Sequence, residues 1–325
     1  MRAVVCNSFT GPGDLRLSEI DEPKPAADEI LIDVRAASVS FMDQLLVSGL
    51  YQMRPRTPFV PGTEASGVVA AVGDKVKRFA AGDRVACSSW TGGYAERMTA
   101  KESKSVLLPD GVTFETAATV LHNYGTAYYA LVGRAEAKRG ETAFITGAAG
   151  GVGLAAVDLG RHLGLRVIAG VGADDKAALV RRFGASDVIN YRSEDLRDRI
   201  KSITGGDGID VGFDNVGGVI FEQMARLMAW GGRLMPIGFT GGDIPQVPMN
   251  LPLLKNYSIV GVFAGAWAEK FSAEAARMND TLVQLLADGK ICPHIDRILP
   301  LEEVGDAMRA IANRTVQGRI ILKIR

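Results

Sequence analysis

The small-residue segment Gly147–Gly153, with the sequence G-A-A-G-G-V-G, constrains the fold of this chain more than any other feature. It follows an apolar run, Thr142–Thr146, and leads into a helical pattern that extends to Leu163. Small residues let a backbone turn tightly and approach a ligand, and the N-terminus of the next helix presents N–H groups to an anion. We therefore predict a strand, loop and helix in which the loop holds the pyrophosphate of a dinucleotide.

The loop departs from the G-x-G-x-x-G pattern, because Ala148 stands at the first glycine and the match is A-x-G-x-x-G. A glycine turn that serves only to pack a helix tightly on a strand would give a similar pattern. The context favours the dinucleotide interpretation, since strands and helices keep alternating after the loop. This alternation predicts an α/β fold, a Rossmann doubly wound parallel sheet with right-handed crossovers. The further strands are expected at 166–171, 187–190, 209–214, 233–237 and 258–263, with helices ending at Phe183, Ile203 and Trp230.

The first 110 residues have a different texture, with short alternating runs separated by Gly, Pro and Asp. Such runs predict a β-rich region with strands at 30–36, 68–72 and 84–87 and one helical turn at 43–48. Helices are expected at 114–133 and 273–288. The last strand-like runs, around Ile298 and at 319–324, have no partners in the α/β unit, so we expect the chain to return to the first domain. The expected domains are residues 1–122 with 266–325, and residues 123–265.

Composition excludes several classes of function. The 37 Lys and Arg balance 37 Asp and Glu, so no net charge attracts the whole chain to nucleic acid or to a membrane surface. The three cysteines are scattered without a C-x-x-C pair, which argues against a disulfide framework and is typical of a reducing compartment. No apolar stretch is long enough for a signal sequence or a membrane span. We expect a cytoplasmic protein with no nucleic-acid or membrane partner.

The residues after the second strand of the α/β unit bear on which dinucleotide binds. An acid there would bind the ribose 2′-hydroxyl of NAD, but the sequence has Gly170–Ala173 instead. Lys176 supplies a positive charge for a 2′-phosphate, and Tyr191 adds a hydroxyl donor. These residues predict NADPH rather than NADH. The alternative is that Asp174 and Asp175 cap a helix and leave Lys176 as a surface charge.

Several motifs follow one another along essentially the whole chain: Gly62-Thr63-Glu64-Ala65-Ser66-Gly67 with Val72-Gly73, Ala80-Ala81-Gly82-Asp83-Arg84-Val85, Gly125-Thr126-Ala127-Tyr128, Ala148–Gly153 and Val188-Ile189-Asn190-Tyr191. In this order they resemble one family, the zinc-free NADPH:quinone oxidoreductase (zeta-crystallin-like) branch of the medium-chain dehydrogenase/reductase superfamily. The resemblance implies a GroES-like β-rich catalytic domain beside the Rossmann domain, an interdomain cleft, and a homodimer.

The resemblance also implies site residues at matching positions. Ser40, Tyr51 and His122 would bind the substrate, with Tyr51 either donating a proton or hydrogen bond or forming an aromatic wall. Many quinone oxidoreductases have Asn where this chain has Ser40, and serine donates only one hydrogen. The implied cofactor contacts are Thr126, Gly150, Gly151, Val152, Gly172, Lys176, Tyr191, Asn215, Gly238, Phe239, Phe263, Gly265 and Arg319.

No metal is expected. The zinc alcohol dehydrogenases of the superfamily carry Cys at the position of Ser40 and His at the position of Thr63, and a hydroxyl is a poor zinc ligand beside thiolate and imidazole. His122 alone cannot hold a catalytic zinc. Hydride transfer to an acceptor that delocalises charge is then the natural chemistry, and a quinone is expected. The alternatives are an enoyl-thioester or enone (alkenal) reductase, and an NADPH-binding protein with little turnover.

Overall fold

The computed structural model describes all residues, 1–325, and the chain divides into two compact units. Unit 1 comprises Met1–His122 and Ala268–Arg325, and unit 2 comprises Asn123–Trp267. No helix is both long and apolar enough to cross a membrane.

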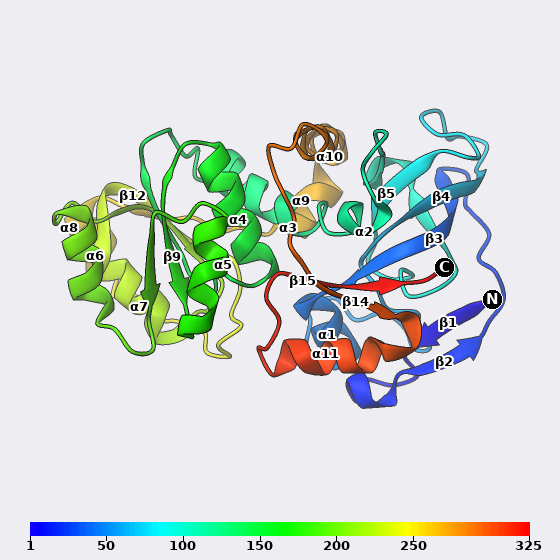
Figure 1. Cartoon of the computed structure of the whole chain (residues 1–325), viewed down its shortest axis with the longest axis horizontal. Helices are drawn as coiled ribbons and strands as arrows, with labels where there is room; N and C mark the ends of the chain where they lie inside the picture. The colour runs from blue at the N-terminus through cyan, green and yellow to red at the C-terminus, as the bar shows by residue number, and fades with distance from the viewer. The chain divides into compact units, whose positions relative to one another are not determined.

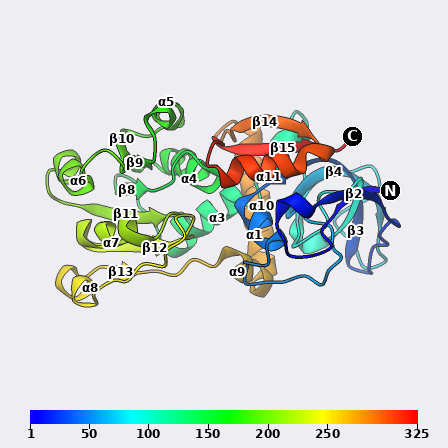
Figure 2. The same ribbon diagram turned by 90° about the horizontal axis from the view of Figure 1, so that it is seen from below.

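Unit 2 is built on a six-stranded parallel sheet in the order β10-β9-β8-β11-β12-β13. The chain starts in the middle at β8, moves outward to β10, and returns to build the other half, so the order reverses between β8 and β11. This is the Rossmann strand order, and ligands of such sheets bind where the order reverses. Helices α4 and α5 lie on one side of the strands and α7 lies on the other (Figure 2). The elements are β8 (Thr142–Ile145), α4 (Gly151–His162), β9 (Arg166–Val171), α5 (Ala177–Arg182), β10 (Asp187–Asn190), α6 (Leu196–Thr204), β11 (Ile209–Asp214), α7 (Gly218–Leu227), β12 (Met228–Pro236), α8 (Asn250–Lys255) and β13 (Ser258–Ile259).

Apolar side chains of the strands explain why this sheet forms. Phe144, Ile168 and Ile189 come from three neighbouring strands and are fully buried, and they pack with Ile200 of α6 and Met224 of α7. Strands buried on both faces need such continuous apolar runs, and these runs are what the sequence shows. The predicted doubly wound parallel sheet is therefore confirmed.

Two expected elements near the end of this sheet differ from the structure. The helix expected to reach Trp230 ends at Leu227, and β12 begins at Met228. The register with β11 jumps from Met228 to Arg233, so Trp230 lies in an irregular stretch and its side chain is 75% exposed. The expected strand 258–263 is only two residues long, as β13.

The single helix expected over 114–133 is also wrong. The structure has α2 (Phe114–Ala117), then turns, then α3 (Asn123–Tyr128) and a π-helical segment, η3 (Tyr129–Arg134). The backbone N–H of His122 donates to Glu64 Oε1 (3.1 Å) instead of to a helical carbonyl. A tertiary hydrogen bond therefore replaces the helical one where the chain passes from unit 1 to unit 2.

Unit 1 contains a β sheet in the order β14-β15-β3-β4-β5-β7, with β6 also paired to β3. The return of the C-terminus is confirmed, because β15 pairs antiparallel with β3; Figure 1 shows the red β15 beside the blue β3. The hydrophobic core of unit 1 combines side chains from both ends of the chain, such as Ile32 and Ile320. The elements are β1 (Arg2–Val5), β2 (Arg16–Glu19), β3 (Glu29–Val39), α1 (Phe41–Val47), β4 (Glu64–Val72), β5 (Arg84–Ser88), β6 (Arg97–Lys101), β7 (Ser105–Leu107), α10 (Ser272–Ala287), β14 (Ile295–Pro300), α11 (Val304–Ala312) and β15 (Arg319–Lys323), while α9 (Ala264–Lys270) spans the boundary between the units.

Candidate functional site

The glycine loop between β8 and α4 contains glycines with two different roles. A Cβ on Gly153 would lie 2.2 Å from the carbonyl oxygen of Gly147, and one on Gly151 would lie 2.8 Å from Asn123 Nδ2. Gly150, the N-cap of α4, has an ordinary φ of −81°, and a Cβ added there would have Gly147 O as its nearest neighbour, at 3.4 Å. Packing therefore requires Gly153, whose close neighbour is backbone, whereas a Cβ on Gly151 would meet only the end of the Asn123 side chain and nothing inside the protein requires Gly150. A small residue at Gly150 leaves room for a ligand at the helix N-terminus.

The ends of β8 and β11 are tied together at the point where the strand order reverses. Thr146 Oγ1 donates to Asp214 Oδ1 (2.5 Å), and Asn215 donates from its backbone N to Thr146 Oγ1 (3.0 Å) and from Nδ2 to Thr146 O (2.8 Å). Burial raises the pKa of Asp214, and its Oδ2 accepts from Gly217 N (2.7 Å). Asn215, an expected cofactor contact, is thus held rigidly beside the glycine loop.

Gly172, Tyr191 and a residue not identified from the sequence meet at the ends of β9 and β10. A Cβ on Gly172 would lie 3.3 Å from Tyr191 Oη and 3.4 Å from Arg192 Nε. Arg192 is exposed and adds a second cation to a place where only Lys176 was expected. The signal that sequence reasoning missed is the basic residue directly after Tyr191.

Asp174 and Asp175 lie in the first turn of η4 (Asp174–Lys176), before α5, which is where the capping alternative places them. Neither η4 nor α5 has a side-chain hydrogen bond at its N-cap. Asp174 Oδ1 instead accepts from Asn190 Nδ2 (2.7 Å) at the end of β10. Asp174 therefore helps to join the ends of β9 and β10.

The remaining expected cofactor contacts of unit 2 follow other strand ends or lie on helices. Gly238 and Phe239 come after β12 and Phe263 comes after β13, and the two phenylalanines are 40% and 53% exposed. Thr126 is partly buried on α3, and Gly265 lies on α9. Residues after neighbouring parallel strands share one edge of the sheet, which is the edge of the glycine loop.

In unit 1, Ser40 caps α1. Its hydroxyl accepts from Asp43 N (3.1 Å) and donates to Asp43 Oδ2 (2.5 Å), and Asp43 Oδ2 also accepts from Ser40 N (2.8 Å). Both residues are buried, and burial raises the pKa of Asp43. The single hydroxyl hydrogen of Ser40 is therefore directed to Asp43 in this arrangement.

A buried charge pair lies beside His122. Glu64 is fully buried; Ser38 Oγ donates to its Oε2 (3.1 Å), and Arg319 Nη2 lies 3.5 Å from the same oxygen. Burial raises the pKa of Glu64 to about 7, although Arg319 and the hydrogen bonds oppose this. Burial and the Arg319 charge lower the pKa of His122 to about 3, so its imidazole is neutral.

Arg319 was expected among the cofactor contacts, and the structure places its side chain in this cluster. Its Nη1 donates to Val39 O (3.3 Å), while Nε and Nη2 are buried without a hydrogen-bond partner.

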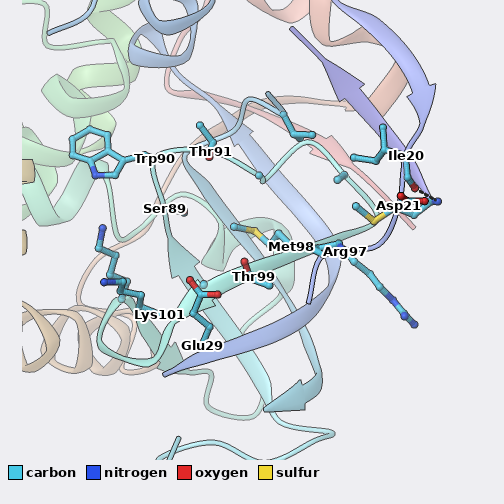
Figure 3. Close-up of a pocket in the computed structure, with 17 residues that line it drawn as sticks. Ile20, Asp21, Glu29, Ser89, Trp90, Thr91, Arg97, Met98, Thr99 and Lys101 are labelled. Carbon is cyan, nitrogen blue, oxygen red and sulfur yellow. Dashed lines mark hydrogen bonds between the residues drawn. The ribbon is translucent and has the colours of Figure 1, made fainter. Parts of the chain in front are cut away.

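Tyr51 lies in a short loop after α1 and contacts Trp90, an aromatic residue that no sequence motif marks. Its ring centroid is 6.3 Å from that of Trp90, with the planes tilted by 48°. Burial raises the pKa of Tyr51, so the phenol keeps its proton at neutral pH. Trp90 also lines a hollow of about 370 Å³ in unit 1, with Ile20 and Asp21 on its far side (Figure 3).

Comparison with known proteins finds a domain model for a segment of each unit. Residues 26–110 match the model of the alcohol dehydrogenase GroES-like domain, and residues 151–280 match that of the zinc-binding dehydrogenase. The chain is 36% identical over 326 residues to rat quinone oxidoreductase-like protein 2, covering 100% of this chain and 92% of the relative. It is 35% identical to human quinone oxidoreductase, covering 99% and 97%. The chain belongs to the quinone oxidoreductase branch of the medium-chain dehydrogenase/reductase superfamily.

A solved member of the branch shows the same fold. The Escherichia coli quinone oxidoreductase, solved in complex with NADPH, superposes with a TM-score of 0.90 at 31% identity and covers 100% of both chains. Membership in the branch makes this protein an oxidoreductase, and the predicted combination of Rossmann and GroES-like folds is confirmed.

The matching family description names zinc, yet the side chains of this branch member do not fit the metal. Ser40 is bonded to Asp43, Thr63 offers a buried hydroxyl, and His122 is the one imidazole in the cluster. No group of three or more His, Cys, Asp or Glu side chains is arranged to hold a metal ion. Zinc prefers thiolate and imidazole, and these side chains do not provide that set of ligands.

Proposed function

We propose that the protein is an NADPH-dependent, zinc-independent reductase that transfers hydride from NADPH to a quinone. The observation that carries the proposal is Gly150, whose missing side chain no internal contact requires, at the helix N-terminus where the strand order reverses. The NADPH complex of the E. coli relative supports the choice of cofactor.

The residues of unit 2 bind and orient the cofactor in this proposal. Backbone N–H groups of Gly150–Val152 bind the pyrophosphate, since the first N–H groups of a helix have no intrahelical acceptor. Lys176, Tyr191 and Arg192 bind the adenosine phosphate, and Gly172 leaves room for it. When bound, NADPH supplies the hydride. Thr126, Asn215, Gly238, Phe239, Phe263 and Gly265 position its nicotinamide half.

Unit 1 supplies the polar groups for the acceptor. Of the three expected substrate residues, Tyr51 has an O–H that stays protonated at neutral pH. The Ser40 hydrogen is directed to Asp43, and the neutral His122 donates at most one N–H. We therefore propose that Tyr51 donates the hydrogen bond or proton to the oxygen on which negative charge develops.

The function is tested by following NADPH oxidation with quinones, alkenals and enoyl-CoA esters as acceptors. The proposal expects turnover with quinones by protein free of zinc in elemental analysis. Turnover only with alkenals or enoyl thioesters would show that the acceptor is an enone and not a quinone. NADPH binding without turnover on any acceptor would make the chain a binding protein, and stoichiometric zinc would remove the zinc-independent mechanism.

Selectivity for NADPH gives a prediction at Lys176 and Arg192. Either residue changed to Ala loses a charge-assisted bond to the 2′-phosphate, so KM for NADPH should rise by about tenfold, about 1.4 kcal/mol. KM for NADH, which lacks this phosphate, should stay within about twofold. Steady-state kinetics with both cofactors measure this, with Lys75→Ala as a control on an exposed loop of unit 1. Equal losses for both cofactors would remove the two residues from the phosphate site.

We also propose a homodimer formed along β13. This strand is at the edge of the sheet, and apolar side chains near it are exposed: Met249 (73%), Leu253 (79%), Leu254 (67%) and Ile259 (40%). Pairing of β13 with β13 of a second copy would satisfy both edges by two-fold symmetry. Sedimentation should give twice the chain mass for the wild type and the chain mass for the double variant Leu254→Lys/Ile259→Lys. A wild-type monomer would contradict the dimer.

The cysteines support the expected cytoplasmic location. Cys6 and Cys87 are buried, Cys292 is exposed, and all three are free thiols. We propose a reducing compartment on this basis. A thiol reagent should detect three thiols in the denatured protein as isolated from its source, and fewer would argue for an oxidising compartment.

A further inference from the structure

Cations gather at one edge of unit 2, where α6, α7 and α8 end. Lys201, Arg226 and Lys255 each lie in the last turn of their helix. Figure 2 shows these helices beside one another in the order α6, α7, α8. Lys255 Nζ donates to Arg226 O (2.8 Å) and to the carbonyl oxygen of Met228 (3.0 Å), the first residue of β12. The cations therefore lie where strands of the parallel sheet begin, at the edge opposite to the glycine loop, which follows the end of β8.

A fourth cation, Arg197, completes this basic cluster. It lies one helical turn before Lys201, so the two side chains share a face of α6. Burial lowers the pKa of Lys255, and the charges of Lys201 and Arg197 lower it further, because they disfavour another positive charge beside them. The basic cluster is therefore a set of like charges that repel one another.

Acidic side chains do not neutralise the basic cluster. Helix α8 carries no acid, and Asp198 of α6 and Glu222 of α7 form no ion pair with the four cations. Glu222 Oε1 instead accepts from Gln246 N (3.0 Å). The ion pairs within unit 2 use other cations, namely Arg161, Arg166, Arg199 and Arg233. Uncompensated like charges destabilise the folded protein, and a bound anion would remove this cost.

A buried hydroxyl beside the basic cluster also lacks a partner. Tyr257 follows α8 and is only 4% exposed, and its Oη has no hydrogen-bond partner. Burial raises the pKa of Tyr257 while the charge of Arg226 lowers it, so the phenol lies near this cation. A protonated phenol can donate to an anion, and the Lys255 ammonium has a third N–H besides the two that bind carbonyls. Donors for an anion are therefore present as well as charge.

The dipoles of the helices give a purely structural alternative for three of the four cations. Cations in the last turn of a helix interact favourably with its dipole, as Lys201, Arg226 and Lys255 do. Arg197 lies in the first turn of α6, where the same dipole disfavours a cation. The dipoles therefore do not account for the complete basic cluster.

We propose that the basic cluster is a further anion site, which binds a small molecule that carries two or more adjacent phosphate groups. Guanidinium groups bind phosphate oxygens in pairs, and ammonium groups add compact charge. Four positive charges exceed the charge of a single carboxylate or phosphate, which favours adjacent phosphates. Because the site lies at the sheet edge opposite to the glycine loop, it does not depend on the proposed function and is occupied together with the dinucleotide.

Calorimetric titration of inorganic tripolyphosphate into the protein saturated with NADP⁺ tests the site. NADP⁺ occupies the glycine loop, so the titration reports binding elsewhere. The wild type should bind one tripolyphosphate per chain, and Arg197→Gln/Lys201→Gln should bind it at least about tenfold more weakly, because two charge-assisted bonds are lost. The control Lys138→Gln/Arg181→Gln removes two exposed charges elsewhere in unit 2 and should keep the affinity within about twofold.

Three results of this titration would overturn the site: no binding by the wild type, equal binding by the two double variants, or displacement of tripolyphosphate by added NADP⁺. Citrate tests the ligand class, since it carries three carboxylates and should bind at least about tenfold more weakly. Citrate binding as tight as that of tripolyphosphate would remove the phosphate class. ATP distinguishes the sources of the phosphates: tighter binding than tripolyphosphate identifies a nucleotide, and equal or weaker binding identifies the phosphates alone.

Thermal unfolding separates anion binding from the helix-dipole alternative. Without an anion, Arg197→Gln/Lys201→Gln should unfold at the same temperature as the wild type or at a higher one, because the substitutions relieve repulsion. Tripolyphosphate should raise the Tm of the wild type and leave that of the double variant nearly unchanged. A lower Tm for the variant, with the same response to tripolyphosphate as the wild type, would show that the cations only stabilise the helix ends.

Discussion

Gly153→Ala should strongly destabilise unit 2, whereas Gly150→Ala should fold normally and lose affinity for NADPH. The new Cβ of Gly153→Ala would lie 2.2 Å from the backbone oxygen of Gly147, which cannot move without breaking the turn. Overpacking of this kind costs about 3 kcal/mol or more. The Cβ of Gly150→Ala meets only an oxygen at 3.4 Å, so stability should change by less than about 1 kcal/mol. The same methyl group would occupy the space of the pyrophosphate and should weaken NADPH binding by at least about tenfold.

Thermal unfolding and a fluorescence titration with NADPH measure the two effects separately. Gly82→Ala serves as the control for backbone strain, because its φ is +96° and the added methyl group would have no atom within 4 Å. It should lose stability without losing affinity for NADPH. If Gly150→Ala binds NADPH as the wild type does, the loop is only a packing turn, which is the alternative that the sequence pattern left open.

The β8–loop–α4 unit and the parallel sheet were predictable because their signals are local. Apolar runs such as Val167–Val171 predict buried strands, and glycines at fixed spacing predict the tight turn between a strand and a helix. The break between α2 and α3 was not predictable, because it depends on a carboxylate 58 residues away in sequence. The irregular start of β12 depends on its register with β11 in the same way.

The residues of the candidate site also fall into those that a sequence pattern predicts and those that it does not. The pyrophosphate loop carries a pattern, so its residues were found from the sequence. Arg192 and Trp90 belong to no sequence pattern. Arg192 lies near Gly172 because the ends of β9 and β10 are neighbours. Trp90 is held by a hydrogen bond to Glu269, which is 179 residues away in sequence. The partners of Arg319 were not predictable from the sequence either, since Glu64 and Val39 come from the other end of the chain.

Glu64 should make the stability of the wild type fall as the pH rises from about 4.5 to about 7. Burial raises the pKa of this carboxyl from 4.5 to about 7, so over that range the folded protein holds a proton that the unfolded chain has released. Stability therefore decreases with pH in this window, and above it the loss is complete and Glu64 causes no further change with pH. The total change is about 3 kcal/mol, from 1.36 kcal/mol for each tenfold change in proton affinity.

Glu64→Gln removes the ionisation but keeps a carbonyl oxygen for His122 N, so the difference between the variant and the wild type isolates this effect. The free energy of unfolding of Glu64→Gln also differs from that of the wild type by a constant amount, because Arg319 lacks its carboxylate partner in the variant at every pH. The pH dependence of the difference is the prediction: relative to the wild type, Glu64→Gln should gain about 3 kcal/mol between pH 4.5 and 8. Urea unfolding across this range measures it, with Glu274→Gln on the exposed face of α10 as the control. Parallel curves for Glu64→Gln and the wild type would show that Arg319 and the hydrogen bonds of Ser38 and His122 outweigh burial, and that Glu64 is an ordinary buried ion pair.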